Sequence, residues 1–245
     1  MNRYFVELSY DGTGYHGWQI QPNAITVQET IEKAFSTLLR TDISLTGAGR
    51  TDTGVHASYF VAHFDHERED IDSLENLVFK LNGILPDDIA IHAVSGVEEQ
   101  MHARFSATYR EYIYVIRKTK PLFNRPYCYY FHGDLDVEQM NLACEILKEY
   151  TDFTSFSKLH TDVKTNDCRI MEAVWSEHDD GVDFTIRADR FLRNMVRSIV
   201  GTMLDVGTGK SDLDAFRSVI ESKDRSMAGT SAPAKGLFLV DVGYE

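Results

Sequence analysis

Residues 47–57 hold the residue types in this sequence most suited to chemistry: a cation, a carboxylate and a histidine set among three glycines, in the run Gly-Ala-Gly-Arg-Thr-Asp-Thr-Gly-Val-His-Ala. Glycine permits positive φ and the close approach of another backbone or a ligand. Such a loop would present Asp52 on a stiff turn, two residues after Arg50. An aspartate is ionised at neutral pH, because its ordinary pKa is about 3.9, so Asp52 could act as a nucleophile. An aspartate in a turn more often caps its own backbone, and the loop alone leaves that role open.

Other familiar kinds of site are absent from the sequence. The glycines form neither a G-x-G-x-x-G run that opens a helix nor a G-x-x-x-x-G-K-[ST] run, so no nucleotide-binding loop is indicated. The three cysteines, Cys128, Cys144 and Cys168, make no C-x-x-C pair, which offers no zinc ribbon or redox motif. An odd, sparse set of thiols suits a reducing cytosol.

Composition and charge narrow the class of protein. The chain has 245 residues, 43% of them apolar, and a formal net charge of −13. No apolar run is long enough to span a bilayer, and Glu7 interrupts the apolar stretch that a signal peptide would need. A cytoplasmic protein without a membrane anchor is therefore predicted. The net charge taken alone argues against a nucleic-acid partner, although a basic cleft can exist on an acidic protein.

Periodicity predicts strands and helices in mixed order. Alternation over residues 3–10 predicts a strand, and the capping box Thr26-Val27-Gln28-Glu29 predicts the start of a helix. A hairpin is expected around Asp180-Gly181. The expected strands are 3–10, 43–46, 58–64, 89–94, 108–117, 169–177, 182–189 and 237–244. Three helices are expected over 72–82, 136–149 and 192–206, and two more are expected to begin at residues 26 and 211.

This order predicts an α+β fold with a largely antiparallel sheet and helices packed on one face. The region around Pro121 and Pro126 is the best candidate for a division of the chain. We therefore expect an N-terminal half, 1–120, that carries the loop with Asp52, and a C-terminal half, 121–245. The two halves are expected to form one continuous catalytic unit.

The loop at 47–57 closely resembles the catalytic loop of the TruA family of tRNA pseudouridine synthases, whose core is G-R-T-D-x-G-V-H. Further segments resemble that family in the same order, so the resemblance runs from about residue 4 to 244. These segments are 10–12, 16–19, 81–82, 85–89, 102–108, 152–156, 195–201, 232–233 and 236–237. Met101, where an aromatic is common, and Gly83, where alanine is expected, are small departures.

The resemblance implies the pseudouridine synthase fold, with a mixed, largely antiparallel sheet and two similar halves around a central cleft. It implies an isomerase that converts uridine to pseudouridine in the anticodon stem-loop of tRNA, at nucleotide positions 38, 39 and 40. The N1–C1′ bond breaks and the uracil rejoins through C5, so no atoms are gained or lost. The resemblance therefore implies no cofactor and no metal.

The same resemblance implies roles for four residues. Asp52 is the expected nucleophile, and the sequence leaves open whether it attacks C1′ or C6. Arg197 is its expected charge partner, on a helix where it would form a basic stripe with Arg190 and Arg193. Tyr112 is expected under the uracil ring, where its hydroxyl could also help to remove the C5 proton. Arg50 is expected to prop the position that the flipped nucleotide vacates.

The resemblance further implies a homodimer with tRNA lying across both subunits. Two half-clefts that combine into one basic groove would reconcile tRNA binding with the acidic net charge. Scattered cations are the candidate phosphate contacts: Arg3, Arg104, Arg110, Arg117, Lys118, Lys120, Lys158 and Arg193.

Two rival functions stay open at this point. One is a carboxylate-pair glycoside hydrolase that uses Asp52 with Asp42 or Asp11. The other is a non-catalytic tRNA-binding or assembly protein on the same fold, which would not depend on Asp52.

Overall fold

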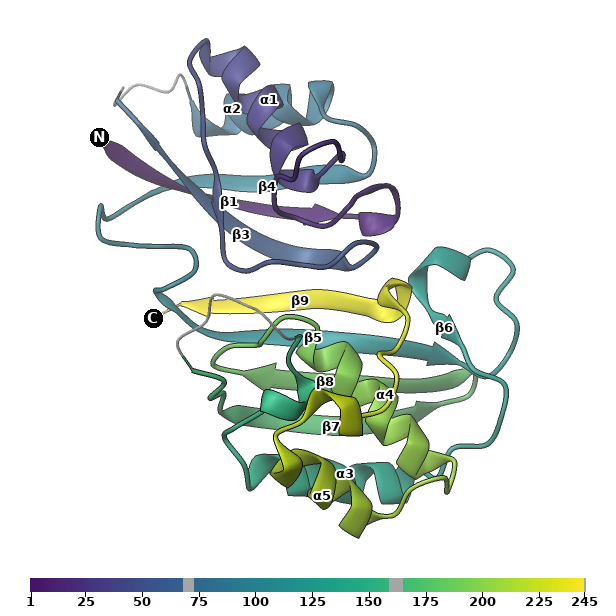
Figure 1. The fold of residues 1–245 in the computed structure, drawn as a ribbon. Helices are drawn as coiled ribbons and strands as arrows, with labels where there is room; N and C mark the ends of the chain where they lie inside the picture. Colours follow the sequence, from purple (N-terminus) through teal and green to yellow (C-terminus); the bar gives the residue numbers. More distant parts are fainter. Residues whose placement is uncertain (68–72, 159–164, 245) are drawn as a thin grey trace. The chain divides into compact units, whose positions relative to one another are not determined.

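The structure is a computed structural model that describes residues 1–67, 73–158 and 165–244 (Figure 1). The chain forms two compact units: residues 1–108 together with 239–245, and residues 109–238. The division thus falls earlier than the 120/121 boundary expected from the prolines. The reason is that residues 110–117 of β5 (Ala107–Arg117) pair with β8 (Gly181–Ala188), so most of β5 belongs to the second unit.

The first unit contains an antiparallel sheet in the order β4-β1-β3. Its strands are β1 (Asn2–Tyr10), β3 (His56–His66) and β4 (Ile89–Val97), with the short β2 (Thr46–Gly47) paired to β3. In the register of β1 and β3, Tyr4 lies opposite Phe64 and Leu8 opposite Phe60. Because side chains alternate along a strand, these large apolar residues share one face of the sheet.

Two helices, α1 (Val27–Leu39) and α2 (Leu74–Ile84), lie on one face of this sheet in Figure 1. Helix α1 begins at the predicted capping box, where the Thr26 side chain accepts a hydrogen bond from Glu29 N, and ends at Arg40 in the left-handed conformation. Its Phe35 is fully buried and its ring centroid lies 5.0 Å from that of Phe64. The Asn82 side chain of α2 makes two hydrogen bonds of 2.8 Å to the backbone of Ile91 in β4.

The last strand, β9 (Leu237–Tyr244), contributes residues from Leu239 onward to the first unit. The Tyr244 hydroxyl donates to the carbonyl of Ala103 at 2.6 Å, and its ring lies 5.1 Å from that of Phe5. The Thr108 hydroxyl donates to the carbonyl of Gly243 at 3.2 Å. Segments from opposite ends of the sequence thus build this one unit.

The second unit contains an antiparallel sheet in the order β5-β8-β7. Strands β7 (Ile170–His178) and β8 form the predicted hairpin, with His178 opposite Gly181. A Cβ at Gly181 would lie 2.0 Å from the carbonyl oxygen of Ile116, so only glycine fits where the hairpin meets β5. The two-residue β6 (Tyr129–Tyr130) runs parallel to β5.

Three helices complete the second unit: α3 (Val137–Lys148), α4 (Met195–Gly207) and α5 (Leu213–Ser222). The Asn141 side chain of α3 makes hydrogen bonds of 2.8 and 3.0 Å to the backbone of Trp175 in β7. Trp175 in turn donates from its indole to the sulfur of Met203 in α4. Five short 3-10 helices lie in the described part of the chain: η1 (Gly12–Gly14), η2 (Arg125–Tyr127), η3 (Thr154–Phe156), η4 (Arg225–Met227) and η5 (Ala234–Gly236).

The architecture confirms the predicted α+β class, with mixed and mostly antiparallel pairing and helices against the sheets. Most predicted elements are present with shifted ends. The helix expected at 72–82 is α2, although residue 72 lies outside the described residues, and the strand expected at 43–46 shortens to β2. No helix in the described ranges is long and apolar enough to cross a membrane.

One sequence interpretation is wrong. Arg190 and Arg193 do not share a helical stripe with Arg197, because α4 begins only at Met195. The residue before it, Asn194, has φ of +66°, a left-handed conformation that cannot continue a helix backwards. Arg193 therefore lies in a turn, where its carbonyl accepts a hydrogen bond from Lys158 N.

Truncation of Phe35 tests the packing of α1 on the first sheet. Phe35→Ala removes a fully buried ring and leaves a cavity, so we expect the free energy of unfolding to fall by about 3–5 kcal/mol. Urea unfolding followed by circular dichroism measures it. The control is Phe79→Ala on α2, where the ring is 79% exposed and the expected change is within about 0.5 kcal/mol. Equal losses in the two variants would contradict this packing.

Candidate active site

Asp52 opens a tight turn in the connection between β2 and β3. Val55 N donates to the Asp52 carbonyl at 3.1 Å, and Gly54 has φ of +76°. A positive φ at the third residue of a four-residue turn is the position at which type II turns need glycine. The side chain of Asp52 is partly exposed, and Arg50 on the same loop is exposed. The turn geometry therefore explains why a glycine follows the carboxylate by two residues.

The glycine-rich segment after β1, residues 11–19, packs directly against this turn. Gly17 has φ of +88°, and a Cβ at that position would lie 2.5 Å from the Thr51 carbonyl oxygen and 3.2 Å from the Asp52 carbonyl carbon. Trp18 N donates to the same Thr51 oxygen at 3.3 Å. A side chain at residue 17 would thus displace the backbone that carries Asp52.

Side chains hold the residue before Asp52 as well. The Thr51 hydroxyl lies 2.8 Å from the Tyr10 hydroxyl in a buried hydrogen bond. The Trp18 ring stacks on Phe60 of β3 with centroids 4.1 Å apart, and a Cβ at Gly47 would lie 2.6 Å from the Trp18 indole nitrogen. Strand β1, strand β3 and the glycine-rich segment therefore fix the backbone at Thr51.

The far side of the turn is held by η1 and His56. A Cβ at Gly12 would lie 2.0 Å from the Val55 carbonyl oxygen, so η1 touches the turn backbone. The buried His56 accepts a hydrogen bond at Nδ1 from Gly12 N at 3.1 Å, and the Asp11 carboxylate lies 3.0 Å from the same nitrogen. The His56 side chain thus meets both the backbone of Gly12 and the side chain of Asp11 at one nitrogen, which holds η1 beside the turn.

Asp11, one of the carboxylates weighed for a hydrolytic pair, has a structural position. Its Oδ1 accepts from Thr13 N at 2.9 Å and from the Thr13 hydroxyl at 2.6 Å, which caps η1. Nearby, Tyr15 donates to Asp88 at 2.6 Å, and burial together with this bond raises the pKa of Tyr15. These contacts fix the glycine-rich segment, which in turn packs against the turn that carries Asp52.

The second unit carries Tyr112 and Arg197. Tyr112 lies on β5, where it is 8% exposed and meets the ring of Phe191 edge-on at 5.2 Å. Its neighbour on the same face, Tyr114, is fully buried and donates to the Pro233 carbonyl at 2.8 Å. Tyr114 is therefore a core residue, as its alternating position predicts, and this burial raises its pKa.

Arg197 lies in the first turn of α4 and is partly buried. Its Nε donates to the Ala232 carbonyl at 2.8 Å, while Ala232 N donates to the Arg197 carbonyl at 2.9 Å. Two reciprocal bonds thus tie the arginine to the segment that precedes β9. Because a guanidinium has several donors in one plane, fixing Nε also fixes the plane of the whole group.

The structure thus places Asp52 and Arg50 on one loop of the first unit, and Tyr112 and Arg197 on two elements of the second. Sequence reasoning missed the residues that hold these groups: Tyr10, Gly17 and Trp18 around Asp52, and Ala232 beside Arg197. The available signal was that segments 10–12, 16–19 and 232–233 were among those that carried the family resemblance.

Comparison with known proteins gives a family model and close relatives for this chain. A protein-family model described as "tRNA pseudouridine synthase" matches residues 8–106 and 147–245. Among curated relatives, each named tRNA pseudouridine synthase A, the protein of Bacteroides fragilis is 57% identical over 245 residues, covering 100% of this chain and 97% of the relative. That of Bacteroides thetaiotaomicron is 58% identical, covering 100% and 91%, and that of Bacillus subtilis is 41% identical, covering 97% of both.

The family model spans most of the chain, and the relatives align with it from end to end. The turn with Asp52 and the helix with Arg197 both fall inside the matched residues. The chain belongs to the tRNA pseudouridine synthase family.

Proposed function

We propose that this protein isomerises uridine to pseudouridine at positions 38, 39 and 40 in the anticodon stem-loop of tRNA, with Asp52 as the nucleophile. The observation that carries this proposal is the immobilised turn. Backbone contacts from Gly12, Gly17 and Trp18 hold the residues on both sides of Asp52, and Asp52 itself is only partly buried.

A carboxylate held in this way suits covalent catalysis. The attacking group meets its target without first losing conformational freedom, which can supply a large share of the barrier reduction. The carboxylate displaces the base or adds to it, the uracil turns, and a carbon–carbon bond to C5 replaces the N1–C1′ bond. The proton that leaves C5 balances the one gained at N1, so the reaction consumes no second substrate.

Arg197 and Tyr112 are the proposed partners of Asp52 in this reaction. A guanidinium beside Asp52 would keep the carboxylate charged once water leaves the site. The Tyr112 ring would support the freed uracil by stacking, and its hydroxyl would take part in removing the C5 proton. The fixed Nε of Arg197 and the packed ring of Tyr112 are consistent with such precise roles.

Arg50 is proposed to occupy the space that the flipped nucleotide leaves. A uridine in a stem must be unstacked before it can react, at a cost of a few kcal/mol. Arg50 is exposed and two residues from Asp52, on the same stiff loop, so it could replace the lost stacking and pairing contacts.

The rival functions have less support. A hydrolase would need a second carboxylate to act as acid or base, but Asp11 is bonded twice to Thr13 and lies against His56, and Asp42 is exposed. A purely binding protein would not require the backbone around Asp52 to be fixed from both sides.

We further propose that the protein works in the cytoplasm as a homodimer, with each tRNA lying across both subunits. Two subunits would combine scattered cations into one basic groove despite the net charge of −13 on each chain. We expect light scattering to give the mass of a dimer. A monomer that modifies tRNA at full rate would contradict the dimer while leaving the chemistry intact.

Asp52→Asn tests the nucleophile directly, because the amide keeps the shape and removes the charge. We expect the wild type to convert uridine in tRNA to pseudouridine and the variant to form none. Nucleoside analysis after complete digestion measures the conversion.

Filter binding provides the control, since both proteins should hold tRNA equally well. Pseudouridine formed by the variant would refute the nucleophile, and release of free uracil by the wild type would favour the hydrolase instead.

Gly17→Ala tests whether the fixed turn matters. The new Cβ would lie 2.5 Å from the Thr51 carbonyl oxygen at a φ of +88°, so the backbone at Asp52 must shift. We expect the rate of pseudouridine formation to fall on the order of 10²-fold, the cost of about 1 Å of misplacement. Gly14→Ala is the matched control, because its Cβ would meet only Asp88 at an ordinary 3.9 Å. Equal rates for the two variants would refute the role of Gly17.

A further inference from the structure

We propose that Arg225 is a positioning residue for the reaction, which sets the orientation of the Arg197 guanidinium by clamping residues 228–231 in place beside α4. Arg225 lies outside the residues to which the family resemblance gave a role. The inference rests on the proposed function, in which Arg197 keeps Asp52 charged.

The first step is the dependence of Arg197 on the segment that follows η4. Arg197 Nε donates to the Ala232 carbonyl at 2.8 Å, and the reciprocal bond from Ala232 N to the Arg197 carbonyl is 2.9 Å. A shift of Ala232 would therefore move both the acceptor that orients the guanidinium and the backbone from which it extends.

The second step is the close packing of this segment on α4. A Cβ at Gly201 would lie 1.8 Å from the Thr230 carbonyl oxygen, so the two backbones touch with no side chain between them. Gly229 N donates to the Thr202 hydroxyl at 2.9 Å, and that hydroxyl donates to the Ser198 carbonyl at 2.8 Å. The segment can keep this position only if its own conformation is fixed.

Arg225 supplies that fixation. Its Nη1 donates to the carbonyls of Ala228 and Gly229, each at 3.3 Å, and its Nη2 donates to the Ser231 hydroxyl at 2.9 Å. Asn194, the residue just before α4, donates to the same hydroxyl at 2.7 Å. One planar group thus binds three residues of the segment, and the Ser231 hydroxyl connects them to the start of the helix that carries Arg197.

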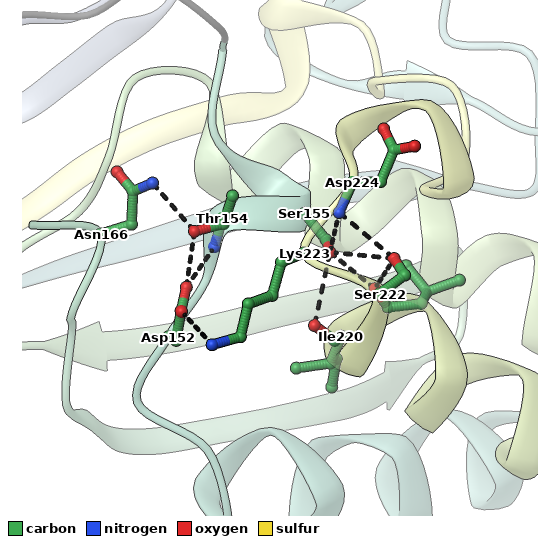
Figure 2. Close-up of polar contacts among 9 residues, drawn as sticks. Asp152, Thr154, Ser155, Asn166, Ile220, Ser222, Lys223 and Asp224 are labelled. Carbon is green, nitrogen blue, oxygen red and sulfur yellow. Dashed lines mark hydrogen bonds and ion pairs between the residues drawn. The ribbon is translucent and has the colours of Figure 1, made fainter.

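The residues just before Arg225 are held in place by hydrogen bonds and an ion pair, which Figure 2 shows. Asp224 caps η4 by accepting from Ser226 N at 2.8 Å, and Asp224 N donates to the Ser155 hydroxyl at 3.1 Å. Ser155 is fully buried and donates to the Val219 carbonyl at 2.6 Å. The end of α5, η3 and η4 therefore meet at one hydroxyl.

A second anchor flanks the first. Lys223, in the left-handed conformation that ends α5, pairs with Asp152 at 2.9 Å (Figure 2). Asp152 also accepts from Thr154 N at 3.0 Å and from the Thr154 hydroxyl at 2.6 Å, and Asn166 donates to that hydroxyl at 2.9 Å. Residues 152–155 were among those that carried the family resemblance. In the structure, these residues hold the chain just after α5 in place through their contacts with Lys223 and Asp224.

The geometry requires arginine at residue 225. A guanidinium presents five donors in a fixed plane, whereas a lysine ammonium is a single point that cannot reach two carbonyls and a hydroxyl on separate residues in one orientation. Lysine should therefore restore charge and part of the clamp, and methionine should restore only the length of the side chain.

The test is the single-turnover rate of pseudouridine formation by Arg225→Met, with tRNA affinity and thermal unfolding measured on the same protein. We expect the rate to fall on the order of 10²-fold with tRNA affinity unchanged, as for a small misplacement of a reacting group. Arg225→Lys should recover part of the rate.

Arg217→Met on α5 is the matched control. Arg217 also makes several contacts, pairing with Glu149 at 2.6 Å and donating to the Tyr150 hydroxyl at 3.1 Å, and both partners follow α3 rather than belonging to segment 228–232. Its rate should stay at the wild-type value even if its thermal stability falls as far as that of Arg225→Met.

A double-mutant cycle separates positioning from general destabilisation. If Arg225 acts through Arg197, then Arg225→Met should cause no further loss of rate in an Arg197→Lys background. Losses that multiply in the double variant would overturn the inference. A wild-type rate for Arg225→Met would also overturn it.

These outcomes are distinct from a failure of the proposed function. If Asp52→Asn still forms pseudouridine, the assigned nucleophile is wrong, whatever Arg225 does. If Asp52→Asn is inactive and Arg225→Met is fully active, the nucleophile stands and the positioning role falls.

Discussion

The contact between the glycine-rich segment and the turn at Asp52 is the constraint on which the proposed chemistry depends. Gly17 lies so near the Thr51–Asp52 backbone that no side chain fits between them. Beside it, Trp18 N donates a hydrogen bond to the Thr51 carbonyl and joins the two backbones directly. Such contacts need no charge and no flexible side chain, so they fix the main chain at Asp52 through the backbone alone. The β1–β3 pairing and the Trp18–Phe60 stack serve to keep these two backbones together.

The same physical solution recurs at Arg197. There, too, a glycine lets two backbones touch, since Gly201 faces the Thr230 carbonyl oxygen. The charged side chain of Arg197 then donates a hydrogen bond to the main chain of the touching segment. In each unit, contacts to the backbone therefore help to hold the residue proposed to act in the reaction. Backbone groups cannot be repositioned by rotamer changes, which makes them suited to holding a group within a fraction of an ångström.

Local sequence patterns predicted most of the helices and strands but few of the contacts between them. Alternation over 3–10 and the capping box at Thr26 correspond to β1 and α1, because period and capping depend on neighbouring residues. The start of α4 was misjudged because Asn194 takes a left-handed conformation, which apolar spacing does not report. Gly17 against Thr51 and Arg225 against Ser231 could not be predicted, since such contacts depend on how distant segments pack.

The return of β9 to the first unit has a consequence for how the protein is made. Tyr244 fills a place beside Phe5 and Ala103, yet it is translated after the whole of the second unit. On the ribosome the domain that bears Asp52 must therefore wait, lacking its last strand, while the intervening residues emerge and fold. Completion of the first unit would then come late, after the chain has been synthesised through the second unit.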